Sequence, residues 1–434
     1  MRTRADKIFF VSLTISLALL LTTAGCGGGN SSPMTTTASP TPPPPSAPPP
    51  APPPTPTPTP PPVPVTPTEF LYAAVGQKAD INGYSIDMSN GHLTLIAGSP
   101  FTVVANGQQA QTCTVGCGRM LTSDPLGKFL FDAYMGSPTP GVVSFAVNPT
   151  SGALTQADFK TPPSNNLTTD PMARFLYGPI GDFSHPAVQA FDINRANGTL
   201  APAPGSPYSY PPQGDTNIAP AVSNLFAYTL TRCNGATGCV GNDVTSHING
   251  FSIDQMTGAL TPLANSPFTG GQLMQGLALH PAGKFLYSEE EYLNGNVFDN
   301  EIVGFQINSD GSLTRLSSAP AQTPDNGVAQ LLVSPNGSFL YHTANGHVRA
   351  YTIDQNTGAL TLTGIFQPVG NIAIDPTVKF VFSTQVMIQG GQAVAQNAIN
   401  VYTVDPLTGA ITAIPDATVM TTETPAGLAV DKTQ

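Results

Sequence analysis

A tight-turn motif that recurs along the chain constrains the fold more than any other feature of the sequence. Each copy has the form Gly-x-Leu-Thr or a close variant, and follows a segment of the form aromatic-x-Ile/Val-Asp/Asn. The turn glycines are Gly91, Gly152, Gly198, Gly258, Gly311, Gly358 and Gly409. Glycine readily adopts the positive φ that a tight hairpin turn requires, so each copy predicts a turn between two antiparallel strands.

A second marker precedes these segments: an apolar strand, a polar-Pro turn, and then Phe-Leu or a close variant. Asp124-Pro125 before Phe129-Leu130 is one example, and His280-Pro281 before Phe285-Leu286 is another. Together the two markers define units of four antiparallel strands, which we call a to d, repeating every 40 to 60 residues. Four-stranded units of this period are typical of β-propeller blades.

The two ends of the repeat region predict how the ring of blades closes. The ordered part begins at a strand b, Phe70-Leu71-Tyr72, with no strand a before it. The C-terminal segment Leu428-Ala429-Val430-Asp431 matches strand a of the other units. We therefore expect residues 69–434 to form one all-β domain, a seven-bladed β-propeller closed by the C-terminal strand joining the first blade, with few exposed sheet edges.

The first 25 residues have the three parts of an export signal: a basic start, an apolar run from Ile8 to Leu21, and small residues before Cys26. The run is too short to span a membrane. The ending Ala24-Gly25-Cys26 resembles a bacterial lipoprotein cleavage site, although Thr23 stands where leucine is commonest. This predicts lipidation of Cys26 and contact with the membrane only through that anchor; an ordinary cleaved signal is the alternative.

Residues 26–68 form the next predicted segment, a Gly/Ser tether followed by a stretch of Pro, Thr, Ala and Ser that cannot form a core. We expect a disordered, semi-rigid spacer that holds residues 69–434 away from the anchor, as a periplasmic or surface protein of the cell envelope.

Composition and charge exclude several classes of protein. With 42 Gly, 46 Pro and only 9% charged residues, a long-helix or coiled-coil protein is excluded. The export segment contains three basic residues and one acidic residue, so its removal changes the net charge from −11 to −13. This charge disfavours nucleic acids and anionic lipid surfaces as partners.

The recurrent Asp-Pro-x-x-Lys-Phe-Leu, Thr-Gly-Ala-Leu-Thr and Ser-Pro-Phe/Tyr motifs together resemble the seven-bladed lactonase family, which includes 6-phosphogluconolactonase-like and carboxymuconate cyclase-like proteins. The resemblance covers residues 69–434, and its motifs are mostly turn and strand residues that specify a fold. It implies that an enzymatic member carries His, Arg and Glu near the starts of the inner strands. At those positions this chain has Arg119, Asn165, Thr216, Gln275, Gln330, Gly370 and Ala426. Arg119, Gln275 and Gln330 are the candidate catalytic residues, although one arginine and several amides do not make a hydrolytic set.

The six histidines give few further candidates. His280 replaces an aspartate of the turn motif and His92 follows a turn glycine, so we expect both to be structural or exposed. His185 and His247 lie in or beside b–c loops. His342 and His347 flank the Asn345-Gly346 turn and would bind a metal only with further ligands.

An acidic segment of the fifth blade offers hard oxygen ligands in a region expected to be a b–c loop. Its candidate metal ligands are Glu289, Glu290, Glu291, Asp299 and Glu301. Calcium suits such ligands, and the alternative is a solvated acidic loop, because the periodic Asp spacing of a known calcium loop is missing.

Four further cysteines, in an exported domain, predict disulfides. Three connectivities are possible, and local pairing as Cys113–Cys117 and Cys233–Cys239 is the expected one, because the two loops belong to non-adjacent blades. A four-cysteine zinc site would require those loops to meet across the channel.

Two functions remain open at this point. The first is a tethered binding or scaffold module at the cell envelope, for a small molecule or an envelope macromolecule, with adhesion as one form of it. The second is a lactone hydrolase, 6-phosphogluconolactonase-like, with or without the assistance of a metal. One observation separates them: a hydrolase places titratable side chains within about 4 Å of one another at the channel mouth.

Overall fold

The computed structural model of the chain divides into two compact units, Met1–Pro62 and Val63–Gln434. The residues that the structure describes all lie in the second unit: 69–75, 79–110, 120–164, 166–181, 185–211, 220–232, 245–294, 297–323, 330–367, 369–389 and 392–432. The predicted signal, Cys26 and the spacer lie outside the described residues. Within the described residues, no helix is long and apolar enough to cross a membrane.

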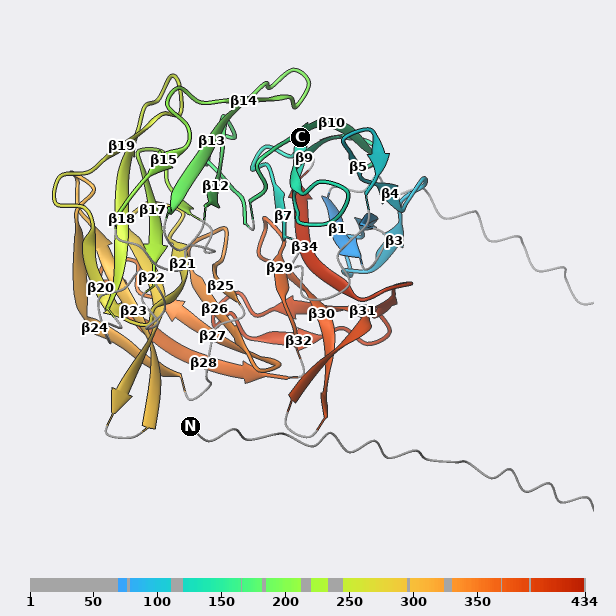
Figure 1. The fold of residues 1–434 in the computed structure, drawn as a ribbon. Helices are drawn as coiled ribbons and strands as arrows, with labels where there is room; N and C mark the ends of the chain where they lie inside the picture. Colours follow the sequence, from blue (N-terminus) through green and yellow to red (C-terminus); the bar gives the residue numbers. More distant parts are fainter. Residues whose placement is uncertain are drawn as a thin grey trace, which may run out of the picture. The chain divides into compact units, whose positions relative to one another are not determined.

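Seven antiparallel sheets form the blades of the propeller, and we number the blades in chain order (Figure 1). Blade one contains β1 (Glu69–Val75), β2 (Asp80–Ile86), β3 (Leu93–Leu95) and β4 (Phe101–Thr102). Blade two contains β7 (Met120–Ser123), β8 (Phe129–Tyr134), β9 (Gly141–Val147) and β10 (Leu154–Lys160). Blade three contains β11 (Thr168–Thr169), β12 (Phe175–Ile180), β13 (Ala187–Ile193), β14 (Leu200–Pro202) and β15 (Tyr208–Ser209). A separate hairpin is formed by β5 (Val104–Ala105) and β6 (Gln108–Gln109).

The remaining four blades repeat this pattern. Blade four contains β16 (Ala221–Val222), β17 (Phe226–Thr231), β18 (Thr245–Ile253), β19 (Leu260–Pro262) and β20 (Phe268–Gln272). Blade five contains β21 (Gln275–Leu279), β22 (Phe285–Asn294), β23 (Val297–Ile307) and β24 (Leu313–Thr323). Blade six contains β25 (Gln330–Val333), β26 (Phe339–Ala344), β27 (His347–Ile353) and β28 (Leu360–Phe366). Blade seven contains β29 (Ile372–Ile374), β30 (Phe380–Gln389), β31 (Gln392–Val404), β32 (Ile411–Ala413) and β33 (Val419–Met420).

The C-terminal strand closes the ring, as the sequence predicts. β34 (Pro425–Lys432) pairs antiparallel with β1 and supplies the inner strand of blade one, with Leu428 opposite Ala73. Figure 1 shows the first and last strands side by side, β1 in blue and β34 in red. Both ends of the domain therefore belong to one sheet, in which β1 lies between β2 and β34 and is paired on both sides.

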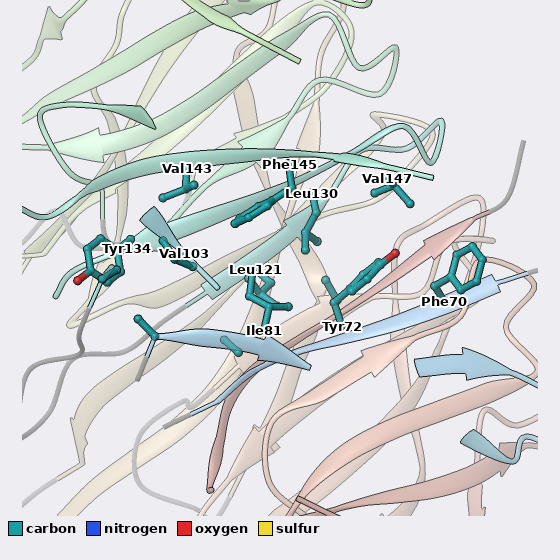
Figure 2. Close-up of a cluster of buried hydrophobic side chains, with 14 of the residues drawn as sticks. Phe70, Tyr72, Ile81, Val103, Leu121, Leu130, Tyr134, Val143, Phe145 and Val147 are labelled. Atoms are coloured by element: carbon teal, nitrogen blue, oxygen red, sulfur yellow. The ribbon is translucent and has the colours of Figure 1, made fainter. Parts of the chain in front are cut away.

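The hydrophobic core lies between neighbouring blades. The described residues form seven buried apolar clusters, and each cluster joins two adjacent blades. Figure 2 shows the cluster between blades one and two, where Phe70 and Tyr72 of β1 pack near Leu121, Leu130 and Phe145 of blade two. Burial of one such aromatic side chain contributes about 1.5–3 kcal/mol, so the ring depends on contacts between blades.

The two recurrent sequence motifs meet at these interfaces. The tyrosine of the Phe-Leu-Tyr strand donates its hydroxyl hydrogen to the carbonyl of the turn glycine in the next blade, as from Tyr287 to Gly358 at 2.9 Å. The same bond joins Tyr72 to Gly152, Tyr177 to Gly258, Tyr228 to Gly311 and Tyr341 to Gly409. The turn glycines have φ between 69° and 82°, and there a Cβ would meet the phenylalanine ring of the preceding blade.

The segment of blade five that was expected to be a b–c loop is instead a long hairpin, and the loop prediction was wrong for it. In blade five, β22 and β23 pair continuously from Phe285↔Gln306 to Asn294↔Val297. Blade seven has a similar hairpin, in which β30 and β31 extend to Gln389↔Gln392 with a shift of register between Thr384 and Val386. Continuous cross-strand pairing holds the acidic residues of blade five on defined faces of a sheet, because side chains alternate along each strand.

A buried carboxyl at the ring closure makes stability depend on pH. Glu69 in β1 is 3% exposed, and its Oε2 has no hydrogen-bond partner within the described part of the chain. Burial, with a smaller contribution from Asp375, raises the pKa of Glu69 to about 8, while Lys432 acts in the opposite direction. The folded protein therefore holds a proton that the unfolded chain releases near pH 4.5. The contribution of Glu69 to stability therefore falls as pH rises above 4.5. It is lowest above pH 8, where Glu69 has lost its proton in the folded protein as well.

We expect Glu69→Gln to remove most of this dependence and to stabilise the protein by about 3 kcal/mol at pH 9, with little change at pH 4.5. Burial also raises the pKa of Asp431, to about 7. Asp431 therefore keeps part of the pH dependence of stability in the variant. Urea unfolding at the two pH values measures the difference. Equal pH slopes in the wild type and the variant would contradict this assignment.

Candidate functional site

A central channel runs between the seven inner strands and forms a cavity of about 740 Å³. Strands β7, β11, β16, β21, β25, β29 and β34 all contribute to its wall. Most of the wall is aliphatic, with Leu277, Leu332 and Ile374 among its residues. The polar residues Asn166, Arg232, Gln275 and Gln330 lie at the end where the inner strands begin, and we call this end the channel mouth.

Of the three candidate catalytic residues, the structure places two at this mouth. Gln275 begins β21 and is paired with Glu289 of β22. Gln330 begins β25, and its amide is engaged by the next blade: Nε2 donates to the carbonyl of Ile372 at 3.0 Å, and Oε1 accepts from the amide of Ile372 at 2.8 Å. Gln330 therefore joins blades six and seven. Arg119 lies outside the described residues.

The channel mouth holds a pair of opposite charges that the sequence analysis did not bring together. Arg232 follows β17 of blade four, and its Nη2 lies 3.7 Å from Oε2 of Glu291 in β22. The side chains of Arg232 and Glu291 are 23% and 20% exposed, so both reach solvent. Arg232 Nε has no hydrogen-bond partner among the residues that the structure describes. The distance of 3.7 Å between Arg232 Nη2 and Glu291 Oε2 is longer than a hydrogen bond. Both groups are therefore able to contact a ligand.

A second group of ionisable side chains is buried between blades five and six, beside the mouth. Glu289 of β22 and His342 of β26 are both 0% exposed, with Glu289 Oε1 3.4 Å from His342 Nε2. Thr323 of β24 donates its hydroxyl hydrogen to the same Glu289 oxygen at 3.3 Å. Within the described chain, Glu289 Oε2 and both ring nitrogens of His342 lack a hydrogen-bond partner. Buried carboxylates and imidazoles with spare hydrogen-bonding capacity are typical of functional sites.

Arg349 and Tyr351 of β27 complete this buried group. Arg349 lies directly opposite His342 in the sheet and is 4% exposed. Burial lowers the pKa of Arg349, while the charge of Glu289 raises it. Burial raises the pKa of Tyr351 to about 12, so its hydroxyl keeps its proton. The group thus combines Glu, His and Arg, the residue types that the family resemblance implies, although they lie on strands b and c instead of at the starts of the inner strands.

The predicted calcium ligands do not share one site. Glu290 and Glu301 face each other across the β22–β23 pair, on the opposite side of the hairpin from Glu289 and Glu291. Arg315 contacts both, with Nη2 2.6 Å from Glu290 Oε2 and 3.4 Å from Glu301 Oε1. Burial and the charge of Glu290 raise the pKa of Glu301. Asp299 lies on this same side, opposite Tyr292.

The described residues contain no group of three or more His, Cys, Asp or Glu side chains arranged to hold a metal ion. Calcium binding stays a prediction. The alternative of a solvated acidic loop is wrong for most of these side chains, because Glu289, Glu290 and Glu301 are 0%, 7% and 9% exposed.

His280 and His92 have the placements expected of them, the first structural and the second exposed. His280 is 3% exposed, and its Nε2 lies 3.1 Å from Oε1 of Gln355 in the next blade. His92 and His185 are exposed. The structure confirms that His342 and His347 flank a tight turn, in which Asn345 and Gly346 both have positive φ. The four cysteines of the predicted disulfides lie outside the described residues, so their pairing stays a prediction.

Comparison with known proteins supports a lactonase-type propeller. Residues 239–430 match the family described as "Lactonase, 7-bladed beta-propeller". No curated protein sequence matches the chain.

Solved structures of low sequence identity share the fold. A candidate 6-phosphogluconolactonase of Bacteroides uniformis aligns with a TM-score of 0.60 and 17% identity, covering 83% of this chain and 98% of that one. A similar candidate from Bacteroides fragilis gives 0.58 and 19%, covering 84% and 98%. The periplasmic gluconolactonase of Pseudomonas aeruginosa gives 0.56 and 15%, covering 84% and 99%. At these identities the likeness establishes the fold.

Proposed function

We propose that the protein hydrolyses a lactone at the channel mouth. The observation that carries the proposal is the pair formed by Arg232 and Glu291, 3.7 Å apart and partly exposed where the channel opens. A carboxylate that can accept a proton, beside a cationic hydrogen-bond donor, is what a hydrolase requires at this place and a binding module does not. The match of residues 239–430 to the lactonase family supports the same reaction class.

The two groups have complementary roles in ester hydrolysis. Glu291 takes a proton from a water molecule, whose oxygen then forms a bond to the lactone carbonyl carbon. Arg232 donates hydrogen bonds to the carbonyl oxygen as negative charge develops on it. The bond between the carbonyl carbon and the ring oxygen breaks, and the proton held by Glu291 passes to that oxygen. The product is the open hydroxy acid, and no redox partner is required.

The buried group behind the mouth supports this assignment. Glu289 is two residues from Glu291 on the same side of β22, and Thr323 hydrogen-bonds Glu289 from β24. A rigid strand and buried polar contacts hold a catalytic side chain more precisely than a loop does.

The sequence supports an extracytoplasmic location for this activity, through its export signal and the lipoprotein-type Cys26. We propose a tethered enzyme of the cell envelope, carried on the proline-rich spacer.

A binding module is the second candidate, and the channel wall is the observation that favours it. A cavity of about 740 Å³ with mostly aliphatic walls suits a small ligand that is held without being turned over.

A lactone panel tests the choice between these functions. We expect the purified full chain to open simple sugar lactones at rates well above the spontaneous reaction, measured as acid release at constant pH. Parallel reactions with added calcium and with a chelator test the calcium prediction, which requires a higher rate with the ion. Binding of a lactone without acid release would favour the binding module and contradict the hydrolase.

A further inference from the structure

A second cavity, of about 320 Å³, opens beside the channel mouth between blades six and seven. It lies at the ends of strands where β26 turns into β27 and where β29 and β34 begin. Its volume is at the lower end of the range for small-molecule sites.

A glycine just before the inner strand β29 shapes one wall of this cavity. Blades five and six have Gln275 and Gln330 at the corresponding position, whereas blades seven and one have Gly370 and Ala426. Gly370 lines the cavity, and a Cβ on it would overlap Oγ1 of Thr384. The glycine therefore allows the close approach that shapes this wall.

None of the residues that line the cavity carries a charge. Its polar side chains are Thr343, Asn345, Asn371 and Thr384, which are hydroxyls and amides, and the rest of the wall is aliphatic or backbone. Hydroxyls and amides both donate and accept hydrogen bonds, so they match the hydroxyl groups of a polyol. A phosphate or carboxylate would find no cationic partner in this lining.

Backbone and side-chain bonds hold the polar wall in place. The backbone N–H of Asn371 donates to Thr384 Oγ1 at 3.0 Å, and the side-chain Nδ2 of Asn371 donates to the carbonyl oxygen of Ala426 at 3.3 Å. Thr343 lies directly opposite Gln330, a channel residue, and Asn371 precedes Ile372, another. Paired strands are about 4.8 Å apart, so the cavity is next to the mouth.

We propose that this cavity is a subsite for an uncharged, multiply hydroxylated chain, the polyol part of a ligand whose carboxyl or lactone end contacts Arg232. As a subsite of the lactone site, this inference rests on the proposed function. It predicts that the site prefers ligands with an unphosphorylated polyol chain over short or phosphorylated ones.

The test blocks the cavity from its rim and measures binding of two hydroxy acids to the full chain by calorimetry. Ala395 is an exposed lining residue of β31, so Ala395→Phe places a ring at the opening. Its neighbour Val394 is 38% exposed and points to the other side of the hairpin, so Val394→Phe is the matched control. D-gluconate is the polyol probe, and 4-hydroxybutyrate is the probe without a polyol chain.

We expect Ala395→Phe to weaken D-gluconate binding at least 10-fold and 4-hydroxybutyrate binding less than 2-fold, with Val394→Phe close to the wild type for both. 6-Phosphogluconate should bind the wild type more weakly than D-gluconate. The subsite is overturned if Ala395→Phe leaves D-gluconate binding unchanged, if both phenylalanine variants weaken it equally, or if the wild type does not bind D-gluconate. The calorimetry measures binding without turnover, so the subsite can be tested even if the protein does not hydrolyse lactones. Failure of the subsite and failure of the proposed function are therefore separate results.

Discussion

Replacement of Glu291 by Gln should lower kcat for lactone hydrolysis at least 100-fold. The amide has almost the same shape as the carboxylate but cannot accept a proton from water at neutral pH, and general-base catalysis contributes about 10²–10⁴-fold to a rate. Glu291 is partly exposed at the channel mouth, so its replacement leaves no buried, unpaired charge. The measurement is the steady-state rate of acid release by the variant and the wild type with the same lactone.

Glu290→Gln is the matched control for this experiment. Glu290 is the preceding residue of the same strand, but it lies on the opposite side of the hairpin and contacts Arg315. We expect this variant to keep kcat within about 3-fold of the wild type. A Glu291→Gln enzyme with more than half of the wild-type kcat would exclude Glu291 as the base.

Gly127→Ala should destabilise the propeller by about 3 kcal/mol, the largest stability effect that we expect from one added methyl group. Gly127 has φ of 67° in the turn between β7 and β8, and a Cβ there would overlap the carbonyl oxygen of Lys432 in β34. Alanine in the left-handed region costs about 1–2 kcal/mol, and forcing an atom into a packed site costs a further 1–3 kcal/mol. Urea unfolding followed by fluorescence or circular dichroism measures the change.

Blade five provides the control for this turn. Gly283 occupies the same turn position with φ of 68°, but the nearest atom to an added Cβ is Ser223 Cβ at 3.7 Å. Gly283→Ala should therefore lower the free energy of unfolding only by about 1–2 kcal/mol, which is what alanine costs in the left-handed region. Blades three and seven carry Ala173 and Val378 at this position with positive φ, so the turn accepts a side chain where the neighbouring strand leaves room. Equal losses in the two variants would show that the closing strand is not involved.

The blade pattern could be predicted because its signals are local. A turn glycine and the Phe-Leu-Tyr strand each appear as a short run of sequence, and the structure joins them through bonds such as that from Tyr341 to Gly409. The closing strand could be predicted because Leu428 and its neighbours repeat the pattern of an inner strand. Repetition supplies the long-range information that a single sequence otherwise lacks.

The site could be predicted only in part, because its residues do not repeat. Gln275 was found from its position at the start of an inner strand, but Arg232, which follows a strand b, has no counterpart in that pattern. The acidic run of blade five was interpreted as a loop, since an uninterrupted row of glutamates is unfavourable in most strands. In the structure Glu289 lies 3.4 Å from His342 and Glu290 pairs with Arg315, and neither contact is visible in the sequence.

The most direct test of the account is a crystal structure of the full chain soaked with D-gluconate. We predict electron density at the channel mouth, with the carboxylate within hydrogen-bond distance of Arg232 and an oxygen of the ligand close to Glu291. Density for the ligand elsewhere on the propeller, with the mouth occupied only by water, would contradict the assignment of the channel mouth as the active site.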